Sequence, residues 1–129
     1  PISINNIYGD YALYTQNAKN TLQKSIKITG KAIEKIKRLK VILSSRNSAQ
    51  EKSLKKIDKI EHDLMSIVET HPKLKSTMLD HTIEYKEKLA GVDFIEENLQ
   101  LSQMLYSDIY ERFIQYRKDC KALLRELSD

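Results

Sequence analysis

The chain of 129 residues contains one cysteine, two prolines, three glycines and no tryptophan. A single cysteine excludes an internal disulfide and a cysteine-rich zinc site. The shortage of proline and glycine leaves few points at which a helix would have to end. No apolar run approaches the roughly 18–20 residues that cross a bilayer, and no signal-peptide pattern opens the chain. These absences favour a helical protein in a reducing compartment, and we expect it in the cytoplasm.

Catalytic and metal-binding motifs are also missing. His62, His71 and His81 each stand near an acidic residue, but the sequence has neither an HExxH motif nor a pair of Glu-x-x-His motifs. Cys120 has no histidine within helical reach that would activate it. We therefore expect a non-enzymatic protein with no cofactor and no metal, in which the histidines and Cys120 are structural.

The composition is that of a folded domain. Apolar residues make up 40% of the chain and charged residues 31%, which is too apolar for a disordered tail. A chain of this length hides roughly two-thirds of its unfolded surface, enough for one core. We expect residues 1–129 to form a single domain. Because residue 1 is Pro rather than Met, we expect this domain to be excised from a larger protein.

Apolar residues recur at alternating steps of three and four, the spacing of helices that pack along their length. This pattern predicts an all-α fold, an elongated antiparallel bundle of three long arms. The arms are expected over residues 11–43, 49–90 and 93–127, after an irregular lead-in over residues 1–9. The inward row of the last arm, which is the most regular, is Ile95, Leu99, Ser102, Tyr106, Ile109, Phe113, Tyr116, Cys120, Leu123 and Leu127.

Capping residues mark the expected ends of these arms. Asp10 is a suitable N-cap for the first arm, and Asp93 for the last. Ser48 and Glu51 have the spacing of a capping box at the start of the middle arm. Gly91 is expected at the position just after its end.

Pro72 interrupts the middle arm. Proline has no backbone N–H to donate and disfavours the helical conformation at the residue before it. Two outcomes fit the sequence. The middle arm is either one helix kinked near Pro72, or two helices that meet at a tight turn, which gives the bundle four helices.

Positive charge is concentrated in the first half of the chain. Residues 1–59 hold 13 Lys and Arg against four acids, whereas residues 60–129 hold nine against 14. Steps of three and four place one set of cations on a single helix face, and a second set begins the middle arm. These residues are Lys24, Lys27, Lys31, Lys35 and Arg38, followed by Lys52, Lys56 and Lys59.

Three interpretations of this basic face stay open at this point. It binds an anionic partner, it is only a solvated helix face, or it pairs internally with the acid-rich residues 80–111. Nucleic acid is a poor partner, because the face lacks interleaved aromatic residues and has few arginines.

We expect a helical protein–protein interaction or adaptor module that presents this face to a helical or acidic surface. The alternative is a peripheral membrane module that binds anionic lipid through the same face. Self-association is a further option. Elongated bundles of this shape occur in adaptor domains of vesicle trafficking, spectrin-type repeats and secretion chaperones. No motif in this chain is specific to one of them.

Tyrosines and surplus apolar residues suggest a second contact region. Tyr8, Tyr11 and Tyr14 recur every three residues near the start of the first arm. They form either a plug that seals one end of the bundle or an exposed aromatic anchor for a partner. Val41 and Met104 lie off the core rows, where they widen the apolar face for a neighbouring helix or for a partner.

Overall fold

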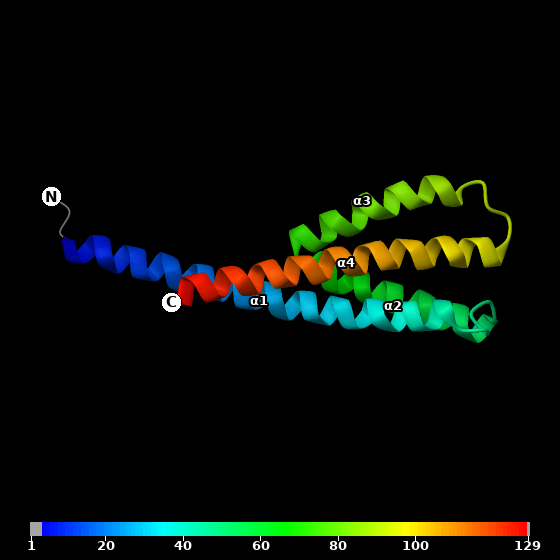
Figure 1. The fold of residues 1–129 in the computed structure, drawn as a ribbon, viewed down its shortest axis with the longest axis horizontal. Coiled ribbons are helices and arrows are strands. Elements are labelled where there is room, and N and C mark those ends of the chain that lie inside the picture. The colour runs from blue at the N-terminus through cyan, green and yellow to red at the C-terminus, as the bar shows by residue number, and fades with distance from the viewer. Residues whose placement is uncertain (1–3, 129) are drawn as a thin grey trace.

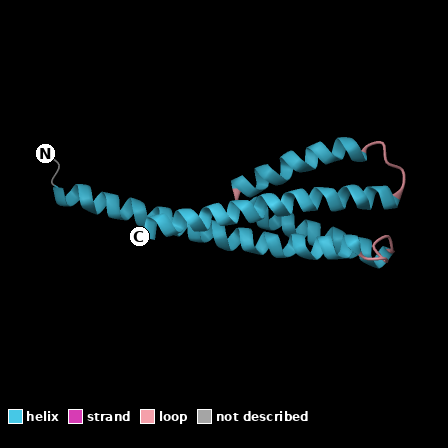
Figure 2. Ribbon diagram, in the orientation of Figure 1, coloured by secondary structure: helices cyan, strands magenta, loops and turns pink. Residues whose placement is uncertain are grey.

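The computed structural model describes residues 4–128, and side chains from residue 12 onwards. The described residues form α-helices joined by short loops, without a strand (Figures 1 and 2). The helices are α1 (Ile4–Ser44), α2 (Glu51–Glu69), α3 (Pro72–Leu89) and α4 (Ile95–Ser128). The predicted all-α bundle is confirmed.

The helices alternate in direction, and each packs against the next, with α4 returning to pack against α1 (Figure 1). The amide of Gln103 on α4 donates to the backbone carbonyl of Leu43, near the end of α1. The side chain of Arg117, further along α4, lies against Gly30 of α1. These two contacts show that α1 and α4 run antiparallel along most of the bundle.

The break at Pro72 is complete, so the second of the two predicted outcomes holds. The chain reverses between α2 and α3 and forms a helical hairpin in place of one long arm (Figure 1). Pro72 takes the first helical position, where its missing N–H costs nothing. His71 is the N-cap, and its Nδ1 accepts a hydrogen bond from the N–H of Leu74 at 3.3 Å.

The predicted starts of the first two helices are wrong. α1 begins at Ile4, so its helix already includes most of the expected lead-in, and Asp10 lies inside it. α2 begins at Glu51, and its N-cap is Gln50, whose side chain makes no capping hydrogen bond. Ser48 therefore does not form the predicted capping box with Glu51, because residues 45–50 are used in successive backbone turns.

The last two boundary predictions have different outcomes. α4 begins at Ile95, which puts Asp93 one residue ahead of the N-cap position. Gly91 does follow the C-cap residue of α3, Ala90, as predicted. Its φ is not positive, however, so this helix ends without the left-handed glycine that commonly closes one.

The core runs along the middle of the bundle. Its largest fully buried side chains are Phe113, Ile36, Leu39, Leu43, Leu64, Leu74, Ile109 and Val68. Two residues of the predicted inward row of α4 are exposed, Ile95 at 55% and Leu123 at 50%, and Ser102, Tyr116 and Leu127 are half-buried. Ile95 lies in the first turn of α4, and Leu123 lies past the level at which α2 and α3 meet. Ile95 and Leu123 thus lie on the predicted face of α4, but no other described helix covers this face near its two ends.

Candidate interaction surface

The lysine row of α1 faces solvent. Lys24, Lys27, Lys31 and Arg38 are exposed. Lys35 is less so: its side chain is 30% exposed, and its Nζ lies 3.6 Å from a carboxylate oxygen of Asp63 on α2. The spacing therefore predicted the exposure of this row, with Lys35 the member that turns towards α2.

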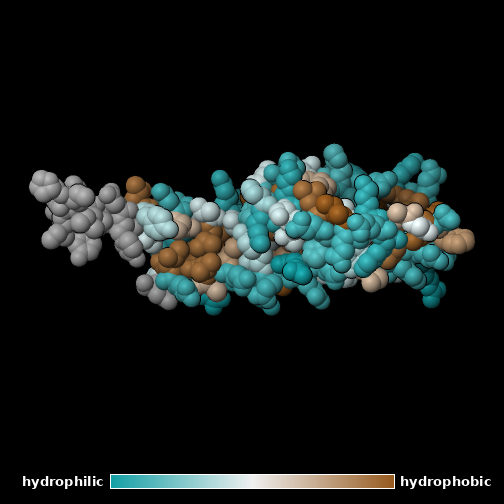
Figure 3. Space-filling model, turned by 90° about the horizontal axis from the view of Figure 1, so that it is seen from above, coloured by the Kyte–Doolittle hydropathy of each residue, from teal (hydrophilic) through white to brown (hydrophobic). Residues whose placement is uncertain are grey.

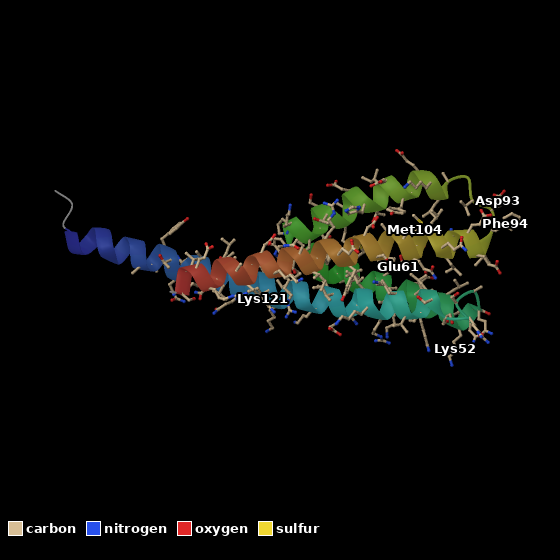
Figure 4. All side chains as sticks on the ribbon, viewed as in Figure 1. Lys52, Glu61, Asp93, Phe94, Met104 and Lys121 are labelled. Atoms are coloured by element: carbon tan, nitrogen blue, oxygen red, sulfur yellow. The ribbon has the colours of Figure 1, made fainter. Side chains whose placement is uncertain are left out.

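The lysine row of α2 adjoins that of α1. Lys59 and Lys56 stand one and two turns before Asp63, the residue that pairs with Lys35, so all three share a face of α2. Lys56 lines the same surface hollow as Arg38. Figure 4 shows Lys52 on the outer side of α2, away from α3 and α4. The basic surface defined by these contacts is Lys24, Lys27, Lys31, Lys35, Arg38, Lys52, Lys56 and Lys59.

The basic surface is not neutralised from within. Among the described residues, Lys35 is the one member that forms an ion pair within 4.0 Å. The neighbouring acids Glu34 and Glu51 pair with Lys37 and Lys55 respectively, which lie outside this set. The acid-rich residues 80–111 make no ion pair with it either. The internal pairing considered from the sequence is therefore not observed.

An apolar hollow lies within the basic surface. Its volume is about 310 Å³, and it is lined by Val41, Ile42, Lys37, Arg38 and Lys56. Val41 is 71% exposed, so it stands among cationic side chains without cover from the chain itself. The long stems of Lys and Arg are apolar, whereas their tips are charged. This arrangement suits an apolar side chain flanked by carboxylates. The sequence singled out Val41 but gave no sign that Lys56 would join it.

The histidines lie apart from one another. His62 is exposed and His71 is buried. His81 faces a hollow of about 500 Å³ between α3 and α4, shared with Glu84, Asp108, Glu111, Arg112 and Gln115. Its Nδ1 is buried without a hydrogen-bond partner. In the part of the chain that the structure describes, no group of three or more His, Cys, Asp or Glu side chains is arranged to hold a metal ion.

Polar contacts inside the bundle were not foreseen from the sequence. The hydroxyl of Tyr106 donates to a carboxylate oxygen of Glu61 at 2.7 Å, linking α4 to α2. Burial raises the pKa of Glu61, and the bond from Tyr106 offsets part of this rise. The hydroxyl of Tyr85 donates to Asp108, and this bond is the main reason that its pKa rises to about 12. Both pairs join residues far apart in sequence, so no local pattern predicts them.

Of the three tyrosines near the start of α1, Tyr14 is the one whose side chain the structure describes, and it does not seal the end of the bundle. Tyr14 is 72% exposed, which contradicts the plug for this residue and leaves the anchor interpretation open. The side chains of Tyr8 and Tyr11 lie outside the described residues. Of the two surplus apolar residues, Val41 lies in the hollow above, and Met104 is exposed on α4 (Figure 4).

Comparisons with protein-family models, with curated proteins and with solved structures found no match to this chain. Within the described residues, no helix has the apolar length that a bilayer crossing requires. The basic surface with its apolar hollow is thus the feature on which a function can be argued from geometry.

Proposed function

We propose that this chain is a non-enzymatic helical interaction module that binds an acidic surface of another protein through its basic surface. The observation that carries this proposal is the set of seven cationic side chains that α1 and α2 leave without an ion pair among the described residues. Two of them, Arg38 and Lys56, line the hollow at the exposed Val41. Aligned charges of one sign attract a partner of opposite sign and speed its approach.

The hollow at Val41 narrows the kind of partner. Charge pairs at an exposed surface contribute only about 0–1 kcal/mol each, so charge alone gives weak and unselective binding. An apolar side chain buried against Val41 and Ile42 would add roughly 1.5–3 kcal/mol. An amphipathic acidic helix would gain both the charge pairs and the apolar burial. One of its apolar residues would enter the hollow, with carboxylates on either side.

The test is affinity purification from a cell extract with the full chain as bait. The variant is Lys27→Glu with Lys31→Glu, and the matched control is Lys73→Glu with Lys86→Glu, which reverses two exposed lysines of α3. We expect the first pair to abolish capture of specific proteins and the control pair to retain it. Equal capture by both variants would remove the basis of the proposal.

The alternative, binding to anionic lipid, uses the same residues and needs its own measurement. Co-sedimentation with phosphatidylserine vesicles and with neutral vesicles separates the two functions. If the chain binds a captured protein but does not sediment with either vesicle, the protein interaction stands. If it sediments only with phosphatidylserine, and Lys27→Glu with Lys31→Glu prevents this, the membrane function replaces it.

A further inference from the structure

The bundle narrows from four helices to two at the level of the hairpin between α2 and α3. His71, in that hairpin, lies 3.1 Å from the hydroxyl of Ser25 on α1 and 3.4 Å from that of Tyr116 on α4. Past this level, only α1 and α4 continue side by side (Figure 1). We call this end of the molecule the stem. It consists of residues 117–128 of α4 and residues 12–24 of α1, of which the first few extend beyond α4.

The apolar row that forms the core of the bundle continues into the stem, where α2 and α3 are no longer present to cover it. On α1 the buried residues Ile36, Ala32 and Thr29 are followed by Ser25, Leu22 and Ala18 at the same steps of four and three. Leu22 and Ala18 are only half-buried.

On α4 the same change occurs past the buried Cys120. Leu123 is half exposed, and Leu124 and Leu127 are half-buried. Figure 3 shows apolar surface gathered where α1 and α4 run together, next to the residues drawn in grey. The stem therefore has the side chains of a larger helical bundle and too few helices to bury them.

α1 extends further than α4. The contact of Arg117 with Gly30 sets the antiparallel register, which places Ser128, the end of α4, level with about residue 19 of α1. Before that point α1 continues with no other described helix beside it (Figure 1). Most of the stability of a helix in a protein comes from packing of its apolar face, and this part of α1 lacks such packing. The extension thus gains stability from any helix that packs on it, and Leu13 and Tyr14 are exposed there.

We propose that the stem is a homodimer interface, in which the start of α1 from one copy lies along the stem of a second copy. Charge complementarity selects this occupant. Residues 4–18 contain no basic residue and one acid, Asp10, whereas residues 19–24 and 117–128 of the stem hold six Lys and Arg against two acids. A helix without positive charge is therefore accepted there, and the start of α1 is such a helix.

Geometry favours the same arrangement. The hairpin at His71 closes one end of the exposed face, so a further helix enters from the open end and runs antiparallel to α1. In a dimer with a twofold axis, the start of each α1 lies along the stem of the other copy. The same contact therefore forms twice, and the dimer is closed. If Ile4 of one copy reaches the level of Ser25 in the other, the axis passes beside Tyr14. Two α1 helices then pair over roughly 30 Å.

The first test is the mass of the full chain by light scattering and sedimentation velocity, over concentrations from about 1 to 200 μM. We expect a dimer, twice the 15.0 kDa of one chain. Tyr14→Lys and Leu22→Glu should each weaken the dimer tenfold or more, and Ile83→Lys, at an exposed apolar site on α3, should not. Tyr14 lies past the end of α4, so its substitution leaves the bundle folded, as circular dichroism would verify.

The second test locates the axis. In a Cys120→Ala background, Tyr14→Cys should form a disulfide-linked dimer on mild oxidation, and Ile83→Cys should not. A monomer at every concentration would overturn the proposal. So would a dimer that Tyr14→Lys leaves intact or that Ile83→Lys disrupts. These results are separable from those on the acidic partner, because the stem shares Lys24 alone with the basic surface, and neither Tyr14 nor Ile83 belongs to that surface.

Discussion

Replacing His71 with alanine should destabilise the protein more than any other histidine change, because this side chain joins three helices. Its Nδ1 accepts from the N–H of Leu74, so in the neutral ring the proton is on Nε2, which donates to the Ser25 hydroxyl at 3.1 Å. The ring also packs edge-on against Tyr116, with 5.5 Å between ring centroids. His71 thus starts α3 and ties its hairpin to both α1 and α4.

The size of the loss follows from these contacts. Removing an N-cap costs about 0.5–2 kcal/mol, and leaving the buried hydroxyl of Ser25 without its partner costs about 1–3 kcal/mol. We expect His71→Ala to lower the free energy of unfolding by about 2–4 kcal/mol. His71→Asn restores a capping oxygen but does not extend to Ser25, so it should recover about 1 kcal/mol.

The assay is urea unfolding followed by far-UV circular dichroism, with exposed His62→Ala as the control. The control should stay within about 0.5 kcal/mol of the parent protein. A loss below about 1 kcal/mol for His71→Ala would refute the capping role, and so would an asparagine variant no more stable than the alanine one.

The same residue gives a pH dependence with a definite sign. Burial lowers the pKa of His71 in the folded chain below its ordinary 6.5. The unfolded chain therefore binds a proton at His71 under mildly acidic conditions in which the folded chain does not. Its contribution to stability is complete above pH 6.5 and is lost as the pH falls from 6.5 towards the lowered pKa. In His71→Asn this part of the pH dependence should be absent.

Three further predictions concern the packing of the bundle. Gly30→Ala should stabilise α1 by about 0.5–1 kcal/mol in thermal unfolding, because the new Cβ meets only the flexible tip of Arg117, at 3.1 Å. Glu61→Gln should stabilise the protein at pH 7 and lose this advantage as the pH falls through the raised pKa of Glu61 towards 4.5, since the bond from Tyr106 is kept and a buried charge is removed. Phe113→Ala should cost about 3–5 kcal/mol in urea unfolding, because its fully buried ring leaves a cavity.

The helices were predictable from the sequence because their apolar rows are long and regular. Tyr106, Ile109 and Phe113 are buried on α4, as their spacing predicts. The helix ends were less predictable, because a cap contributes only about 1 kcal/mol and tertiary packing easily outweighs it. The outcome at Pro72 also depended on distant residues. His71 has the extended backbone that the following proline favours, and its contact with Ser25 joins the reversed chain to α1. No local pattern records this contact.

The sequence predicted the two lysine rows of the candidate site, but it did not predict that they would form one surface. Charged residues on one helix face stay in water, so the exposure of Lys27 and Lys31 followed from spacing alone. The union of the two lysine rows required the register between α1 and α2, which the contact of Lys35 with Asp63 now fixes. The hollow at Val41 likewise needs a side chain from another helix, so single-helix reasoning could not locate it.

The fold converts the uneven charge along the sequence into an uneven charge across the molecule. The bases of α1 and α2 form one surface, whereas Glu84, Asp108 and Glu111 line the hollow between α3 and α4. Had α4 turned Asp108 and Glu111 towards α1, they would have offset part of the charge of the lysines. Because they line the hollow beside α3 instead, an acidic partner would be drawn to the lysine side and repelled from the other. The orientation of binding would then be set before any contact forms, and added salt would slow association much more than it would speed dissociation.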